Sequence, residues 1–156
     1  MHCCLNDQRV ESRHENLPRH VQPLDTKTQP RIAVEAEAIL GVLTLCEAGQ
    51  MELLSSATLM FELERNPHPV RKEYALKVLA KAAVLIPTDS QLEEHARRFQ
   101  AEGIKPVDAL HLASAVVAKA DYFCTCDDRF LTRAKALKTG QTRVVSPMEL
   151  ITEVTQ

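Results

Sequence analysis

Residues 105–130, KPVDALHLASAVVAKADYFCTCDDRF, decide the fold class of this chain. They begin with a proline-started helix made almost wholly of apolar residues, which predicts burial on nearly all sides. A short strand over 122–125 follows, and a helical run over 129–137 comes after it. Helix, strand and helix in close succession are typical of a parallel sheet that is covered by helices on both faces.

Three polar side chains interrupt the apolar helix. Asp108, His111 and Ser114 are spaced three apart, so they form one narrow stripe. A carboxylate is rarely buried without a partner, because removing its charge from water is costly. The stripe therefore faces either a helix end that it caps or a wet, charged cleft. Asp108 also fits a simpler role, as a first-turn acid after Pro106 that complements the helix dipole.

A pair of carboxylates, Asp127 and Asp128, follows the strand at its C-terminal end. Ligands of open parallel α/β sheets bind outside the carboxyl ends of the strands, so Asp127 stands where such a site is built. Asp is also a favoured N-cap, and capping explains Asp127 locally as well as a binding site does. Asp108 and Asp127 together point to chemistry more strongly than either residue does by itself.

The rest of the chain continues the alternation of helices and strands. Helices are expected over 32–48, 57–65, 70–83, 88–100 and from 146, and strands over 51–55, 84–86 and 143–145, with 84–86 buried. Gly49 is a natural helix C-cap, and Ser146 opens a capping-box pattern. The sequence therefore predicts a three-layer α/β/α fold with a mostly parallel central sheet.

Composition bounds the class of protein. With 156 residues, 45% of them apolar, the chain is expected to form a single domain over 1–156. It holds no run of about eighteen apolar residues and no signal-peptide core, which predicts a soluble, cytoplasmic protein that does not contact a membrane. Five cysteines in such a chain are expected to be reduced, and the Cys-Cys and Cys-x-Cys spacings fit a zinc site poorly.

Charge and aromatic content argue against broad attraction to nucleic acid. The formal charge is −2 and aromatic residues make up 4% of the chain. Contact with RNA would have to rest on a local basic patch, which a solvated helix face explains equally well. The candidate residues for that patch are Arg129, Arg133, Lys135, Lys138 and Arg143.

Two motifs carry a resemblance to a known family. Residues 108–115, DALHLASA, followed by 120–130, ADYFCTCDDRF, resemble the C-terminal half of a PIN domain, the family that includes the VapC-like toxin ribonucleases of bacterial toxin–antitoxin pairs. Upstream, residues 29–43 are similar to the first long helix of that family, and residues 53–66, LLSSATLMFELERN, to its second strand and following helix. The resemblance covers residues 28–156.

This resemblance implies a metal-dependent endoribonuclease whose acidic ligands are Glu62, Asp108 and Asp127. Carboxylates that converge need a cation, and hard oxygen ligands suit Mg²⁺ or Mn²⁺. The ion would activate a water for attack on a phosphodiester. The resemblance also implies RNA as substrate, a cognate antitoxin as partner and a homodimer as an assembly. Three residues are expected in supporting roles: Thr125, Asp128 and His111.

The N-terminus departs from the family pattern. Members begin with a strand that ends in Leu-Asp-Thr, followed in similar sequences by Cys-Cys-Leu-Asn, whereas this chain begins MHCCLN, so Met1 stands at the first catalytic Asp. A stunted first strand from about His2 is expected, followed by an inserted flexible loop over 7–23. Residues 24–26, LDT, copy the motif, but no apolar strand precedes them, so Asp25 is not expected to replace the acid.

Three readings of this departure stay open. Without one acid the ion would be held more weakly, so RNA cleavage is expected to be weak or absent. The chain is then an impaired nuclease, or a catalytically inactive PIN fold that acts as a protein-binding module. The third reading is that the natural protein extends upstream of Met1 and restores both the strand and the acid.

Overall fold

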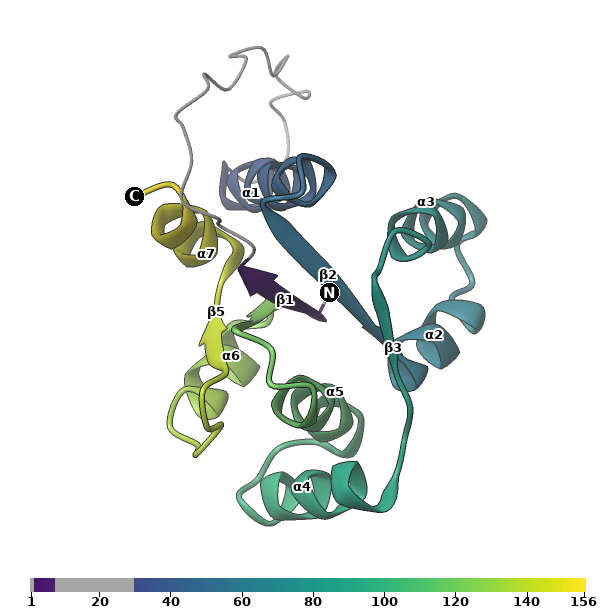
Figure 1. The fold of residues 1–156 in the computed structure, drawn as a ribbon, viewed down its shortest axis with the longest axis vertical. Coiled ribbons are helices and arrows are strands. Elements are labelled where there is room, and N and C mark those ends of the chain that lie inside the picture. The colour runs from purple at the N-terminus through teal and green to yellow at the C-terminus, as the bar shows by residue number, and fades with distance from the viewer. Residues whose placement is uncertain (1, 8–29) are drawn as a thin grey trace.

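A five-stranded sheet with helices on both faces organises residues 2–7 and 30–156, the part of the chain that the computed structural model describes (Figure 1). The strands are β1 (His2–Asp7), β2 (Met51–Ser56), β3 (Val84–Ile86), β4 (Tyr122–Thr125) and β5 (Arg143–Val145). The helices are α1 (Pro30–Glu47), α2 (Ala57–Glu64), α3 (Pro69–Leu79), α4 (Ser90–Ala101), α5 (Pro106–Val117), α6 (Asp128–Ala134) and α7 (Pro147–Val154). The predicted three-layer α/β/α fold is confirmed.

The strand order in the sheet is β3-β2-β1-β4-β5. β2 pairs with β3 in parallel, and β4 pairs with β5 in parallel. β1 lies between β2 and β4 and is antiparallel to both, so β2 and β4 run in the same direction. The predicted mostly parallel sheet is therefore confirmed, and β1 is the strand that runs the other way.

β1 begins at His2, as predicted, and its six residues make it as long as β2. His2 pairs with Thr125, and Asp7 pairs with Met51, so β1 starts at the sheet edge where β4 ends. The sequence assigned residue 7 to the inserted loop; that assignment is wrong at Asp7, because its backbone pairs with β2. Residues 8–23, Met1 and Asp25 lie outside the described residues.

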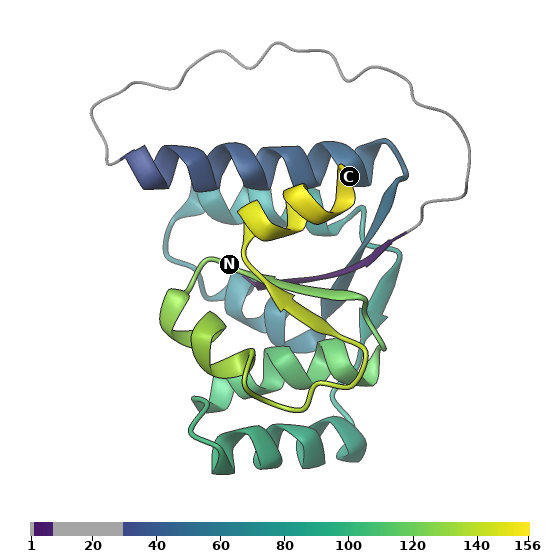
Figure 2. The same ribbon diagram turned by 90° about the vertical axis from the view of Figure 1, so that its left-hand side faces the viewer.

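Side chains on the central strands alternate between two cores, as the two-residue period of a strand requires. Phe123 belongs to the core beneath α4 and α5, where Leu112 is fully buried. Its neighbour Tyr122 belongs to the opposite core beneath α1 and α7, where Leu150 is fully buried. Figure 2 shows α1 and α7 on one side of the sheet and α4 and α5 on the other.

Helix α5 is the most deeply buried helix within residues 105–130. Ala109, Leu112, Ala113 and Ala115 have no exposed surface, and the small alanines allow α4 to pack closely on α5. Burial is not complete, because Val107 in the first turn is 44% exposed. The middle of the helix is therefore enclosed beneath the sheet, and its most exposed residues lie in the first turn.

The sequence predicted a buried strand at 84–86, and the structure corrects this. Val84 and Leu85 are 48% and 61% exposed, and only Ile86 is buried. The physical reason is position: β3 is an edge strand that pairs with β2 alone among the described strands. The preceding helix is also shorter than predicted, since α3 ends at Leu79 and the chain turns before β3.

Local signals fixed most helix ends correctly. Gly49 has a φ of 70°, and Gln50 donates its N–H to the carbonyl of Leu45, which is the predicted glycine C-cap of α1. Ser146 and Glu149 form the predicted capping box of α7. Among the described helices, none is long and apolar enough to cross a membrane.

Candidate functional site

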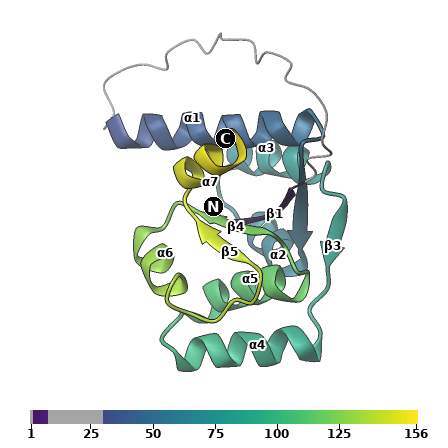
Figure 3. The ribbon, with the colours of Figure 1, turned by 60° about the vertical axis from the view of Figure 1, so that its left-hand side comes forward.

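The C-terminal edge of the parallel strands gathers the elements that carry the predicted carboxylates (Figure 3). α2 begins directly after β2 ends, and α6 begins directly after β4 ends. α5 leads into the start of β4, so the first turn of α5 lies toward the edge at which β4 ends. Glu62, Asp108 and Asp127 therefore come from three different elements at one edge of the sheet.

Asp127 is the N-cap of α6. Its Oδ1 accepts a hydrogen bond of 3.0 Å from the N–H of Phe130, and its own N–H donates to Oγ1 of Thr125 at 3.1 Å. The capping role that the sequence allowed is thus present. A carboxylate has two oxygens, so a cap that uses Oδ1 is compatible with a ligand role for the same residue.

Asp108 and the two smaller candidates occupy distinct places around this edge. Asp108 lies half-buried in the first turn of α5, after Pro106. Thr125 is 1% exposed, and its hydroxyl shapes the turn between β4 and α6 by accepting from Asp127. Asp128 is exposed in the first turn of α6, where an acid complements the helix dipole.

Glu62 and His111 form a direct contact between α2 and α5. Nε2 of His111 lies 2.5 Å from Oε2 of Glu62. The His111 side chain is 3% exposed, whereas the Glu62 side chain is 47% exposed. The predicted polar stripe on α5 is thus buried at two of its three positions, since Ser114 is also fully buried and donates its hydroxyl to the carbonyl of Leu110.

The described residues do not contain three or more His, Cys, Asp or Glu side chains placed to hold a metal ion. Convergence of Glu62, Asp108 and Asp127 on one ion therefore stays a prediction. What the structure supplies is oxygen donors on three elements at one edge.

Two hollows adjoin this edge. Glu62 lines one of them together with Cys124 and Cys126. Thr125 and Asp128 line the other, again with Cys126. Cys126, which follows β4, and Pro147, which begins α7, line both hollows, so Glu62 and Thr125 line neighbouring depressions.

Sequence reasoning missed Glu35, an acid on α1 that lines the hollow of Thr125 and Asp128. Its side chain is half-buried. No local signal singled it out, because Glu35 and Glu37 are two ordinary acids in the first half of a long helix. Glu35 reaches this hollow because α1 packs against α7.

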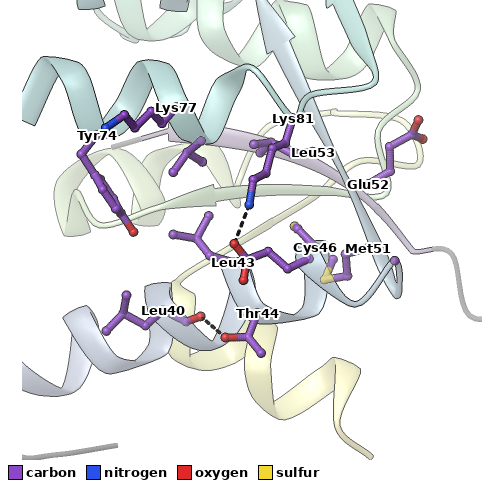
Figure 4. A pocket seen from close by; sticks show the side chains of 13 residues that line it. Leu40, Leu43, Thr44, Cys46, Met51, Glu52, Leu53, Tyr74, Lys77 and Lys81 are labelled. Carbon is purple, nitrogen blue, oxygen red and sulfur yellow. Dashed lines mark hydrogen bonds and ion pairs between the residues drawn. The ribbon is translucent and has the colours of Figure 1, made fainter.

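A further groove lies away from the predicted carboxylates, between α1 and α3 (Figure 4). Leu40 and Leu43 of α1 and Tyr74 of α3 supply its apolar walls. Lys81 reaches across it and pairs with Glu47 at 2.6 Å. The groove contains no residue that the sequence predicted for the site, and it shares Leu43 and Tyr74 with the hollow that Glu62 lines.

The predicted basic patch is partly neutralised within the chain. Lys135 pairs with Glu149 at 2.5 Å, and Arg143 pairs with Glu153 at 2.7 Å. The hydrogen bond from Lys135, followed by that from the Ser146 N–H, holds the pKa of Glu149 below its usual value. Arg129 is exposed beside Asp128 and remains available for contact with an anionic partner.

One comparison with known proteins gave a match. The family model described as PIN domain matches residues 21–136, which is more than half of the chain and includes Glu62, Asp108 and Asp127. No curated protein and no solved structure matches the chain.

Proposed function

Because the chain belongs to the PIN-domain family, which is generally one of nucleases, we propose that it is a divalent-metal-dependent endoribonuclease and the toxin of a toxin–antitoxin pair. One observation carries the proposal: within the matched residues, α2, α5 and the turn before α6 each bring one acid to the same edge of the sheet. Active sites of such sheets lie at this edge.

The donor set fits Mg²⁺ or Mn²⁺. Glu62, Asp108 and Asp127 offer hard carboxylate oxygens, which both ions prefer, and carboxylates brought together need a positive charge between them. We assign these three residues to hold the ion. When bound, the ion would supply Lewis-acid chemistry: a water of lowered pKa and stabilisation of negative charge on a phosphodiester.

The neighbouring residues prepare this edge for an anionic substrate. Thr125 accepts the N–H of Asp127 and so fixes the turn that carries the carboxylate. Asp128 adds an outer negative charge, and exposed Arg129 supplies a positive one for the RNA backbone. A cognate antitoxin and a homodimer remain the proposed protein partners.

A second function, protein binding by a catalytically inactive PIN fold, is favoured by one observation. The described residues lack a cluster of three side chains placed to hold a metal ion. The sequence adds that Met1 stands at the position of the first acidic ligand. In this case the chain would act by binding a partner protein, and substitutions of Asp108 or Asp127 would leave that binding unchanged.

Cleavage of a structured RNA by the purified protein tests both proposals. The RNA is incubated with Mn²⁺ or with a chelator, for the unmodified chain and for an extended form in which a strand ending in Leu-Asp-Thr replaces Met1 and His2 and runs directly into Cys3. We expect weak metal-dependent cleavage by the unmodified chain and stronger cleavage by the extended form. Asp108→Asn in the extended form should lower the rate by at least about tenfold, because it removes a charged ligand.

Glu94→Gln is the matched control, because Glu94 is an exposed acid on α4, on the far side of α5 from the sheet. It should leave the rate unchanged. Cleavage by neither form would reject the nuclease proposal and favour the binding module. Full metal-dependent activity of the unmodified chain would instead show that another residue supplies the first acidic ligand, and Asp25→Asn would be the next variant to measure.

A further inference from the structure

The contact between His111 and Glu62 joins two helices that are packed very differently. α5 places Leu112, Ala113 and Ser114, the residues that follow His111, in fully buried positions. α2, by contrast, has no buried residue along its whole length from Ala57 to Glu64. Apolar packing therefore encloses His111 almost completely, whereas it encloses the side chains of α2 only in part, and Glu62 is among the exposed ones.

The chemistry of the contact fixes the direction of the hydrogen bond. An ionised carboxylate only accepts, so Nε2 of His111 must carry the proton that it shares with Oε2 of Glu62. This holds for neutral and for protonated imidazole. A hydrogen bond with one charged partner is stronger and more directional than a neutral one, and the buried imidazole would lose a partner for Nε2 if Glu62 turned away.

Resting on the proposed function, we infer that His111 is a positioning residue that holds Glu62 in place for the ion. The bond uses Oε2 of Glu62, and Oε1 makes no hydrogen bond or ion pair with another described residue. His111 thus fixes one oxygen of the carboxylate and leaves the other as the ligand. Helix α5 supplies Asp108 directly and controls Glu62 through His111.

A double-mutant cycle tests the positioning without metal or RNA. The full chain, Glu62→Gln, His111→Leu and the double variant are unfolded in urea. We expect the two changes to be coupled by roughly fivefold or more in the unfolding equilibrium constant, which is typical of residues in contact. In protein labelled with ¹³C at glutamate carboxyls, the Glu62 signal, assigned through Glu62→Gln, should shift in His111→Leu and stay nearly unchanged in His111→Gln.

Mn²⁺ binding, measured by calorimetry on the same proteins, supplies the link to the ion. His111→Leu should weaken binding by about tenfold, and His111→Gln, whose amide N–H replaces Nε2–H, should recover most of it. His95→Leu is the control, since His95 contacts Arg98 on α4, away from Glu62. Such a rescue would not follow from loss of packing, because Gln and Leu both fill the space.

Additive effects in the cycle together with an unmoved Glu62 signal in His111→Leu would overturn the inference. A coupled cycle in a chain that binds no Mn²⁺ has a different meaning: His111 then still positions Glu62, and it is the proposed metal-dependent function that fails. The two failures are therefore distinguishable.

Discussion

Single residues at the sheet edge serve local structure and the proposed chemistry together. Asp127 was equally explained by capping and by ligation, and its hydrogen bond to Phe130 shows the cap. The sequence revealed Asp127 because cap and site both require an acid directly after a strand. It could not reveal the bond between Glu62 and His111, which lie 49 residues apart and meet only through the placement of two helices.

The contacts of Glu149 predict how the stability of the fold depends on pH. The hydrogen bond from Lys135, then that from the Ser146 N–H, lowers its pKa in the folded chain below the ordinary value of 4.5. A lowered folded pKa stabilises the fold above the unfolded pKa, and this contribution is lost as pH falls through the folded value. Glu149→Gln keeps a neutral capping box, so its stability should fall less than that of the unmodified chain between about pH 5 and pH 3.

Urea unfolding at a series of pH values measures this difference. Glu94→Gln, which changes an exposed acid outside any cap, is the comparison. Parallel acid dependence of Glu149→Gln and the unmodified chain would show that the contacts of Glu149 do not contribute to stability.

At the scale of elements, the sequence predicted helices correctly where a capping residue precedes a periodic apolar pattern. Ser146 caps α7, as the sequence indicated, and Asp89 caps α4 through the N–H of Leu92, within the helix predicted from residue 88. The strand at 84–86 was located correctly but placed at the wrong depth. Whether a short apolar run is central or at an edge depends on which strands pair with it, and that information is not local.

The exposure of β3 predicts opposite responses at neighbouring positions. Leu85→Lys should change stability by less than about 0.5 kcal/mol, because Leu85 is 61% exposed. Ile86→Ala should cost about 2–5 kcal/mol, because it leaves a cavity in a closed core. Urea unfolding gives both values. A large loss for Leu85→Lys would mean that another molecule covers this edge, and light scattering of the unmodified chain would then show association.

For the whole molecule, the layered architecture followed from the alternation of helices and strands, whereas the direction of β1 did not. A short strand can pair with its neighbours in either direction, so only the register of β1, with His2 opposite Thr125 and Asp7 opposite Met51, settles it. The edge of the sheet that carries the candidate site was predictable at this scale, because the carboxyl ends of parallel strands lie at the same edge.

The two cores share one sheet, and this predicts cooperative unfolding. Leu112 and Leu150 are fully buried on opposite faces. Each change to alanine should cost about 2–5 kcal/mol, and the double variant should lose the sum within about 0.5 kcal/mol, since the residues belong to separate clusters. Circular dichroism and the fluorescence of the two tyrosines, Tyr74 and Tyr122, should report one common transition. Met148→Ala, at a 45% exposed position, is the control. Separate transitions for the two faces would contradict the coupling of the two cores through their shared sheet.

The reversed direction of β1 also has a practical consequence for handling the protein. Because His2 pairs with Thr125, anything fused ahead of His2 emerges beside the turn that carries Asp127. The end of α7 lies toward the opposite edge of the sheet, as Figure 2 shows. An affinity tag placed after Gln156 therefore leaves the edge that carries Asp127 uncovered, whereas one placed ahead of His2 lies beside that edge.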